Sequence, residues 1–377
     1  MISIAEIQSI GIFLFGFLII AVANSPFSNA ISMRRQSHIY NESRWLLIYA
    51  LTLFLAHYLL QRCMGFRQIG EQQAALINII FYTPAIIFVH LSLLNLLHFG
   101  ERKRWHDIMG GSLVAAIYLL LFLLGMTVEG GLMGHSPIIR RAEYTISTVT
   151  SILILFYYYD EWKQYHRIVS NLDDFYDSPQ QEFIRWFATS VVLLAILSFL
   201  TPFLIYISNM VLLTLHGMLA FGAIGFLTLN FLHYGTDGSM MKMFVAHEET
   251  QGTQSVAKGA VQKAESAEIS LVALRVNQWL ASRRYLQSGL NAEEISKEIG
   301  IDRNLLKIYL QSQHYPKISS WLAVHRIEEA KRMLLSHPEY SHDVIAEQCG
   351  FSSREYFQIS FRNIVGIPPM QWQRENK

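Results

Sequence analysis

Long apolar stretches recur along the chain up to Phe231 and then stop. A helix that crosses a lipid bilayer needs about 20 mainly apolar residues. The stretches near this length are Ile4–Ala23, Trp45–Leu60, Ala74–Leu97, Ile108–Met126, Tyr144–Tyr159, Phe187–Ile207 and Met210–Phe231. We therefore predict an all-α protein in which residues 1–234 form a bundle of seven transmembrane helices.

The pattern of apolar residues changes after the last of these stretches. Residues 235–266 are mostly small and polar, a composition typical of a linker. From Ile269 onward, apolar residues recur at spacings of three and four, which indicates amphipathic helices. Residues 267–377 are therefore expected to form a soluble, helical domain.

A helix, a tight turn and a second helix are predicted near the start of this domain. The first helix runs from Ala292 to Ile299, and Gly300 follows it as a residue suited to a left-handed backbone. Asp302 is the type of residue that caps the N-terminus of the next helix. In a helix-turn-helix, the second helix can lie in the major groove of DNA while the first crosses the backbone.

The same pattern returns about fifty residues later. Ser341 is placed to cap a short helix that ends at Gly350, and Ser352 or Ser353 to cap a further helix through Arg362. A single helix-turn-helix is also a common packing unit in proteins. Two copies joined by a long helix favour a role in DNA binding.

The helical period identifies the side chains that point away from the core of this domain. In the second helix of each motif, large apolar residues such as Leu306 and Phe357 form the inward stripe. The residues expected to face DNA are Arg303, Asn304, Lys307, Ile308, Arg354, Glu355, Gln358, Ile359 and Arg362. Arginine, asparagine and glutamine make bidentate contacts with the edges of guanine or adenine.

Two stretches carry a family resemblance, "RIEEAKRMLL" and "IAEQCGFSSREYFQISFRNIVGIPPMQW". They resemble the DNA-binding domain of AraC/XylS-type transcription regulators, and the resemblance extends from about Ile269 to the end. The residues at the family's spacings are Arg326, Ile327, Ala330, Leu334, Gly350, Phe351, Phe357, Phe361, Gly366 and Pro369. The resemblance implies two recognition helices, held by a connecting helix, that enter successive major grooves. Ile308 and Ile359 depart from the arginine that the family often carries there, so its base preference does not transfer.

Residues 1–234 are similar only in architecture to a membrane-anchored subset of this family. The composition agrees with a membrane class, because 52% of the residues are hydrophobic, 16% are charged and the mean hydropathy is positive. A multi-pass protein with a soluble C-terminal domain is the expected arrangement.

Lysine and arginine are distributed unevenly between the loops on the two sides of the predicted bundle. Cytoplasmic loops carry the excess of these residues. One side has Arg34, Arg35, Arg44, Arg102, Lys103, Arg104, Lys163, Arg167 and Arg185, and the other has Arg62, Arg67, Arg140 and Arg141. The asymmetry predicts an external N-terminus and a cytoplasmic C-terminus in the inner membrane of a bacterium. The longest inner loop, residues 160–187, is expected either to lie at the membrane interface or to be solvated.

Several ionisable side chains are predicted near the outer side of the membrane. Such groups are costly at membrane depth and are candidates for function. The proposed ligand-binding residues are His57, Glu129, Arg140, Arg141 and His216. They would form an outward pocket for an anionic molecule or a metal, or they would simply be hydrated at helix ends. No pair of histidines one helical turn apart occurs in a span, so neither a metal site nor a cofactor is predicted.

These observations favour a membrane-embedded one-component transcription regulator that senses an external or membrane signal. The alternative is a transporter or membrane receptor whose tail binds protein. An enzyme is not predicted, because no constellation of nucleophile, base and orienting group stands out. The expected partners are double-stranded promoter DNA, membrane lipid and an unknown small-molecule signal, with RNA polymerase as a further candidate.

The charge of the C-terminal domain is a weak footprint for a nucleic-acid binder. Basic residues exceed acidic residues by only about three from Leu271 onward. Phosphate contacts are expected from Arg283 with Arg284 and from Lys331 with Arg332. Since one such domain would occupy a promoter poorly, we expect a homodimer that gains affinity through avidity.

Overall fold

The computed structural model describes residues 4–25, 34–65, 71–128, 131–132, 136–175, 184–207, 210–236, 266–315 and 317–376. The chain divides into two compact units. One comprises Met1–His166 with Phe183–Lys242, and the other comprises Arg167–Glu182 with Met243–Lys377. The described residues of both units form helices and no extended strand. The predicted linker, residues 235–266, lies almost entirely outside the described residues, so the predicted domain boundaries stay predictions.

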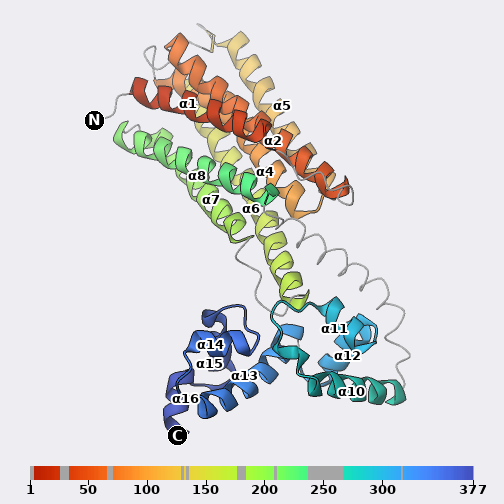
Figure 1. Ribbon diagram of the computed structural model, residues 1–377. Helices are drawn as coiled ribbons and strands as arrows, with labels where there is room; N and C mark the ends of the chain where they lie inside the picture. Colours follow the sequence, from red (N-terminus) through yellow and green to blue (C-terminus); the bar gives the residue numbers. More distant parts are fainter. Residues whose placement is uncertain are drawn as a thin grey trace. The chain divides into compact units, whose positions relative to one another are not determined.

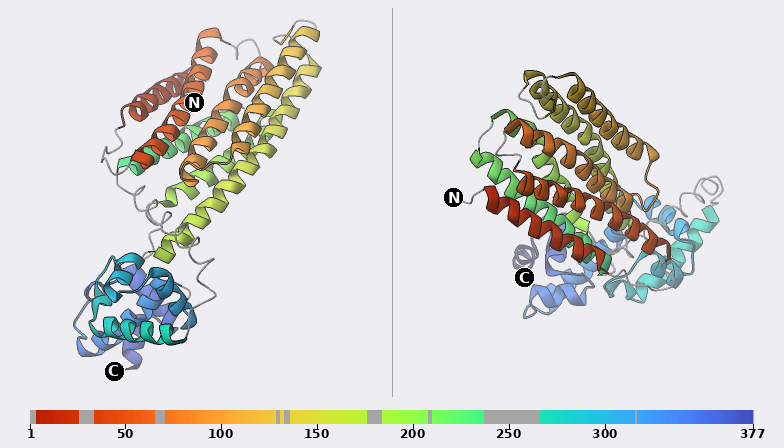
Figure 2. Two further views of the ribbon diagram at one scale, coloured as in Figure 1. Left: turned by 90° about the vertical axis from the view of Figure 1, so that its right-hand side faces the viewer. Right: turned by 90° about the horizontal axis from the view of Figure 1, so that it is seen from above.

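Seven helices lie in the described residues between 4 and 236, and they run alongside one another as a bundle (Figures 1 and 2). They are α1 (Ile4–Ala23), α2 (Arg34–Met64), α4 (Glu71–Leu97), α5 (Arg104–Thr127), α6 (Pro137–Phe175), α7 (Arg185–Ile207) and α8 (Met210–Thr236). Each of the seven predicted apolar stretches falls within one of these helices.

Five segments of these helices are long and apolar enough to cross a membrane. They are Ala5–Ala23, Gln36–Met64, Gln72–Leu97, Arg104–Thr127 and Thr214–Gly235. A shorter apolar segment, Arg185–Thr201, belongs to α7. The coarse prediction of several apolar helices is confirmed, whereas the count of seven spans stays a prediction.

The α6 helix differs from its prediction. The sequence predicted a span that ends at Tyr159 and then a loop, but α6 is one helix of 39 residues. Asp160 and Glu161, the charged pair that suggested the loop, lie inside the helix and are buried. Tertiary partners for these carboxylates, described below, explain how the helix continues through them.

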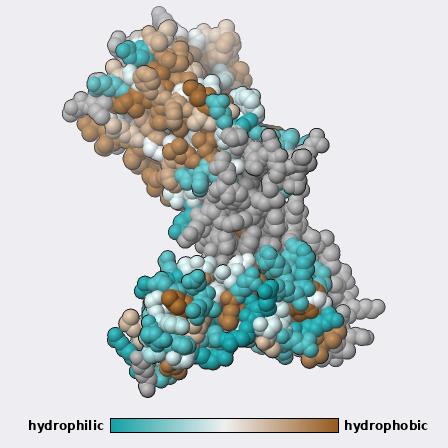
Figure 3. All heavy atoms as spheres, in the orientation of Figure 1, coloured by the Kyte–Doolittle hydropathy of each residue, from teal (hydrophilic) through white to brown (hydrophobic). Residues whose placement is uncertain are grey.

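Large apolar side chains are exposed on the outside of the bundle. Phe13 and Phe17 of α1 are 79% and 62% exposed, and Phe122 of α5 is 62% exposed. Figure 3 shows the visible face of the bundle as predominantly hydrophobic and the visible face of the C-terminal domain as predominantly hydrophilic. Apolar surface of this extent marks an interaction site or a membrane-facing surface.

The described C-terminal residues form a series of short helices. They are α10 (Ser266–Ala281), the 3-10 helix η3 (Arg284–Leu286), α11 (Ala292–Ile299), α12 (Arg303–Ser312), α13 (Ile318–Ser336), α14 (His342–Gln348), α15 (Arg354–Val365) and α16 (Pro369–Glu375). The helices α11 and α12 pack on α10, whereas α14, α15 and α16 pack on α13. The connecting helix α13 also contacts α12 and therefore joins the two halves.

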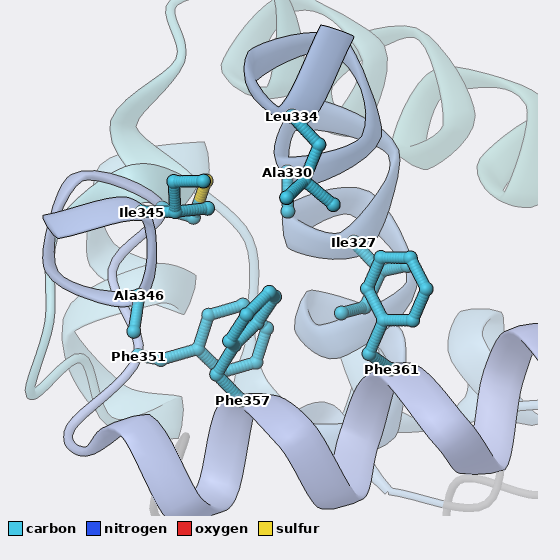
Figure 4. Close-up of a cluster of buried hydrophobic side chains, with 9 residues drawn as sticks. Ile327, Ala330, Leu334, Ile345, Ala346, Phe351, Phe357 and Phe361 are labelled. Carbon is cyan, nitrogen blue, oxygen red and sulfur yellow. The ribbon is translucent and has the colours of Figure 1, made fainter. Parts of the chain in front are cut away.

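The second half is built around a core of aromatic and aliphatic side chains (Figure 4). Phe357 and Phe361 of α15 are fully buried against Ile327 and Ala330 of α13. Burial also raises the pKa of the Cys349 thiol to about 12, so this side chain acts as a small apolar group. The inward stripe predicted for α15 is confirmed.

Candidate functional site

The first helix-turn-helix consists of α11 and α12. Its first helix starts with a capping box, in which the Asn291 side chain accepts hydrogen bonds from the next turn and Glu294 bonds back. Gly300 ends this helix with φ +74°, and the Ile301 amide donates to the Ser296 carbonyl at 3.1 Å. Asp302 caps α12 by accepting from the Asn304 amide at 2.8 Å. The predicted positions of Gly300 and Asp302 in this turn are confirmed.

The second helix-turn-helix, α14 and α15, repeats this geometry. Gly350 has φ +79°, and the Phe351 amide donates to the Ala346 carbonyl at 2.9 Å. Ser353, rather than Ser352, caps α15 by accepting from the Tyr356 amide at 3.1 Å. Ser341 caps α14 as predicted.

The helices α12 and α15 correspond position by position when they are aligned at their first residues. Leu306 and Phe357 then coincide, and both are fully buried. Ile308 and Ile359 coincide two residues later on the opposite face, where Ile359 is 52% exposed. The two motifs therefore present equivalent faces away from the core, as two recognition helices require.

Most of the predicted DNA-facing side chains are accessible. Lys307, Arg354, Glu355, Ile359 and Arg362 are exposed. The remaining members of the set are half-buried, namely Arg303, Asn304, Ile308 and Gln358. Arg354 also forms an ion pair of 3.2 Å with Asp343 of α14. Exposed pairs contribute little stability, so a phosphate or base can displace this partner.

Arg326, in the middle of α13, links the second motif to the turn that precedes the first. The side chain is fully buried, and its guanidinium donates to the carbonyls of Tyr285 and Gln287, both at 2.7 Å. The Phe351 ring lies 6.0 Å from the same guanidinium. This residue therefore ties the turn around η3 to the turn of the second motif. The sequence marked Arg326 through its spacing, but it did not reveal this bridging role.

The basic pairs predicted to contact phosphates have acidic partners within the domain. Arg283 and Arg332 pair with Glu329, and Arg284 pairs with Glu298. Arg284 and a 2.7 Å hydrogen bond from the Trp279 indole hold the pKa of Glu298 below its usual value. These carboxylates reduce the positive charge that the clusters offer. The exposed Lys307 and Arg362 are better placed for phosphate contacts.

Residues 295–375 match a family model described as a helix-turn-helix domain. The match runs from α11 to α16 and includes both motifs. It supports the assignment of this part of the chain as the DNA-binding domain of a transcription regulator, a class that is generally not enzymatic. The match also supports the AraC type that the sequence predicted for this domain. No curated protein and no solved structure gave a significant match to the chain.

A cavity of about 250 Å³ lies within the helix bundle. Side chains from α1, α2, α4, α6, α7 and α8 line it, and two of the predicted ligand residues, His57 and His216, are among them. Arg140 and Arg141 are exposed at the start of α6 and do not line the cavity. Glu129 lies outside the described residues.

Both cavity histidines already have polar neighbours. The Nε2 atom of His57 lies 2.6 Å from the Asn78 side-chain oxygen. The Nε2 atom of His216 lies 3.3 Å from the Thr201 hydroxyl and 3.2 Å from the Leu197 carbonyl. The described residues contain no group of three or more His, Cys, Asp or Glu that could hold a metal ion. Around these two histidines, the described residues offer hydrogen-bonding groups.

Sequence reasoning missed other polar groups that line the cavity. Gln61 lies one helical turn after His57 on α2, and Thr150 lies within an apolar stretch of α6. The side-chain oxygens of Gln61 and Thr150 are buried and have no hydrogen-bond partner among the described residues. A polar residue spaced at one helical turn inside an apolar stretch was the available signal.

A second polar cluster links α4, α5 and α6. The carboxylate of Asp160 lies 2.9 Å from His98 and 3.0 Å from His106, while Glu161 lies 2.8 Å from His90. All five side chains are buried or nearly so. None of them lines the cavity. The histidines give Asp160 and Glu161 polar partners inside the bundle, so α6 can continue through these two residues beyond its predicted end.

Proposed function

We propose that this protein is a membrane-embedded one-component transcription regulator. The helix bundle receives an external or membrane signal, and the C-terminal domain binds promoter DNA through both helix-turn-helix motifs. The observation that carries the proposal is the pair of equivalent motifs in a chain whose described residues also include five helices apolar enough to span a membrane.

The two motifs would read DNA in similar but unequal ways. Arg354 and Gln358 lie on the outer face of α15 and have the chemistry to contact guanine and adenine. Lys307 lies on the corresponding face of α12. Ile308 and Ile359 would contact thymine methyl groups. A promoter site with two half-sites in successive major grooves therefore fits this domain.

Replacing Arg354 or Gln358 with alanine is expected to weaken binding to the specific site by about 1–3 kcal/mol and to relax base preference at one position. The measurement is a titration of the full-length protein, in lipid nanodiscs, with promoter DNA and with a scrambled sequence. The discrimination between the two DNAs should fall in both variants. Wild-type binding should also weaken steeply with added salt, because neutralised phosphates release counterions.

The matched control is Arg374→Ala, which removes the same charge from an exposed position on α16. It should leave base preference unchanged. If Arg374→Ala and Arg354→Ala lose the same amount of discrimination between promoter DNA and the scrambled sequence, Arg354 of α15 does not read bases. No salt-dependent binding to any DNA would contradict the proposed function itself.

The proposed orientation places the C-terminus in the cytoplasm of a bacterium, because nine basic residues flank the apolar stretches on that side of the predicted topology and four flank them on the other. A phosphatase that is active only outside the inner membrane, fused after Lys377, should therefore be silent. The same enzyme fused after Val128, between α5 and α6, should be active. The opposite pair of results would contradict both the orientation and the access of the domain to DNA.

We further propose that the regulator acts as a homodimer. Two domains on one promoter would raise the effective concentration of each for its half-site without any new base contact. The signal would then act on the arrangement of the two domains, and a ligand can bias that equilibrium only through its difference in affinity for the two arrangements.

A further inference from the structure

The cavity lies at one end of the helix bundle. It is lined by residues near the start of α1, α4 and α8, such as Gln8, Asn78 and Thr214, and near the end of α2, such as Gln61. Because successive helices alternate in direction, these positions belong to the same side of the membrane. In the proposed orientation this is the outer half, opposite to the side on which the C-terminal domain follows α8.

The inner end of the cavity is apolar on every helix that lines it. The deepest lining residue of each helix, counted from the outer side, carries an aromatic or aliphatic side chain. These residues are Phe15, Phe54, Ile86, Ile154, Leu194 and Ile224. We call them the cavity floor. The ring of Phe15 stacks on Phe54 with a centroid distance of 5.2 Å, so these two residues contribute aromatic surface at the inner end of the cavity.

The outer end of the cavity is polar. The same helices contribute hydroxyl, amide or imidazole groups within two residues of their outermost lining positions, although Ile7 of α1 also lies there. These residues are Gln8, Gln61, Asn78, Ser147, Thr201 and His216. We call them the cavity mouth. The cavity is therefore polar at its mouth and apolar at its floor. A ligand that fits it must have a polar end toward the mouth and an apolar end toward the floor.

None of the described lining residues is Asp, Glu, Lys or Arg. A charged ligand would have no opposite charge to pair with, and burial of an unpaired charge is strongly unfavourable. Two buried side-chain oxygens, those of Gln61 and Thr150, have no hydrogen-bond partner among the described residues. Gln61 is 5% exposed and Thr150 is 8% exposed, so water has little access to either residue. A hydroxyl or amide group on a ligand would satisfy such acceptors.

We propose that this cavity binds an uncharged amphiphile, with its apolar body on the floor and a hydroxyl or primary amide group at the mouth. This inference rests on the proposed function, since it assigns a chemical class to the signal of the same regulator. It replaces the anionic molecule or metal that the sequence suggested, because Arg140 and Arg141 do not line the cavity. The aromatic floor favours a body that contains a ring.

The test uses four compounds with one body and different charge: 4-phenylbutan-1-ol, 4-phenylbutanamide, 4-phenylbutanoate and 4-phenylbutylammonium. Each is titrated into the full-length protein in nanodiscs of zwitterionic lipid, and empty nanodiscs supply the correction for partitioning. We expect saturable binding of the alcohol and the amide, with a Kd at least about tenfold below that of either charged compound. Equal or tighter saturable binding of a charged compound would overturn the proposal.

Gly217 of α8 offers a variant that fills the cavity. It lines the cavity, and a Cβ added there meets no atom within 4 Å. Gly217→Phe should therefore abolish binding of the amide. Gly222→Phe is the matched control, because Gly222 lies on the same helix, has equal space for a Cβ and does not line the cavity. Equal loss in both variants would contradict this location of the site.

A second pair of variants keeps the test valid if Gly217→Phe does not fold. Thr150→Val removes a hydroxyl from the cavity with little change in shape, and it should raise the Kd of the amide about two- to tenfold. Thr145→Val makes the same change at an exposed position of α6 outside the cavity and should leave the Kd unchanged. An unchanged Kd of the amide in Thr150→Val would show that Thr150 does not contact the ligand. If Gly217→Phe also binds the amide as the wild type does, the proposal is wrong.

The amphiphile has two possible sources, an external solute and a neutral lipid of the membrane. Mass spectrometry of lipids that co-purify with the protein separates them. A neutral lipid present in the wild type and absent from Gly217→Phe would identify the membrane as the source. If no lipid co-purifies and the alcohol and amide bind, the source is a free solute. If no neutral lipid co-purifies and neither compound binds, the proposal is wrong.

The same samples separate this proposal from the proposed function. Titration with promoter DNA needs no ligand, so intact DNA binding without any binding of the amphiphiles would contradict the cavity assignment alone. Binding of the amphiphiles without DNA binding would contradict the regulator and leave the chemistry of the cavity in place.

Discussion

Replacing Gly350 with valine is expected to unfold the second half of the DNA-binding domain and to abolish DNA binding. Gly350 has φ +79°, a left-handed conformation that is unfavourable for a β-branched residue. A Cβ at this position would also lie 2.4 Å from the carbonyl oxygen of Leu286 and 3.1 Å from Nε of Arg326. The backbone of η3 must move, so we expect a loss of at least about 4 kcal/mol.

Hydrogen exchange of the full-length protein measures this effect in peptides from α14 and α15. Gly366→Val is the matched control, because Gly366 has φ +91° but a Cβ there meets no atom within 4 Å. The control should lose only the backbone term of about 1–2 kcal/mol. Equal protection from hydrogen exchange in Gly350→Val and Gly366→Val would contradict the expected clash between the new Cβ at position 350 and Leu286.

Replacing Arg326 with methionine is expected to destabilise the domain by about 3 kcal/mol, because two carbonyls near a buried site lose their donor. Methionine keeps most of the side-chain volume and removes the guanidinium that binds Tyr285 and Gln287. Peptides from η3 and α15 should therefore exchange about 100-fold faster than in the wild type. Because Arg326 holds η3 against the turn of the second motif, protection of the half-site bound by α15 should weaken in footprints on promoter DNA.

Arg332→Met provides the control for this second variant. Arg332 lies on the same helix, is 66% exposed in its side chain and pairs with Glu329. Loss of an exposed pair should cost less than about 1 kcal/mol. Arg326 does not hold η3 against the second motif if both variants exchange at the wild-type rate.

Local chemistry explains why both helix-turn-helix motifs were predictable from sequence. Asp302 and Ser341 cap helices that start one residue later, and Gly300 and Gly350 adopt the left-handed backbone that ends the first helix of each motif. Each of these preferences depends on a few neighbouring residues. The resemblance to a known family added the connecting helix, which the helical period alone could not orient.

Contacts between distant residues account for what the sequence did not predict. Asp160 and Glu161 look like the end of a membrane helix, but both are buried beside His98, just after α4, and His90 of α4. Two of the predicted ligand residues, His57 and His216, line one cavity, whereas Arg140 and Arg141 lie elsewhere. The direction in which a side chain of a membrane helix points depends on its neighbours, and a single sequence does not contain that information.

The helix α6 is long and uninterrupted, so a small tilt at one position produces a larger displacement further along it. Between Ile138 and Phe175 it contains no glycine or proline at which a kink would form. Thr150 lines the cavity, and Leu172 lies about 33 Å further along the helix axis. A tilt of about 5° at the cavity therefore displaces the backbone at Leu172 by about 3 Å. This exceeds the shifts of about 1–2 Å that switch many helix interfaces, so a small tilt of α6 at the cavity would be amplified along the length of the helix.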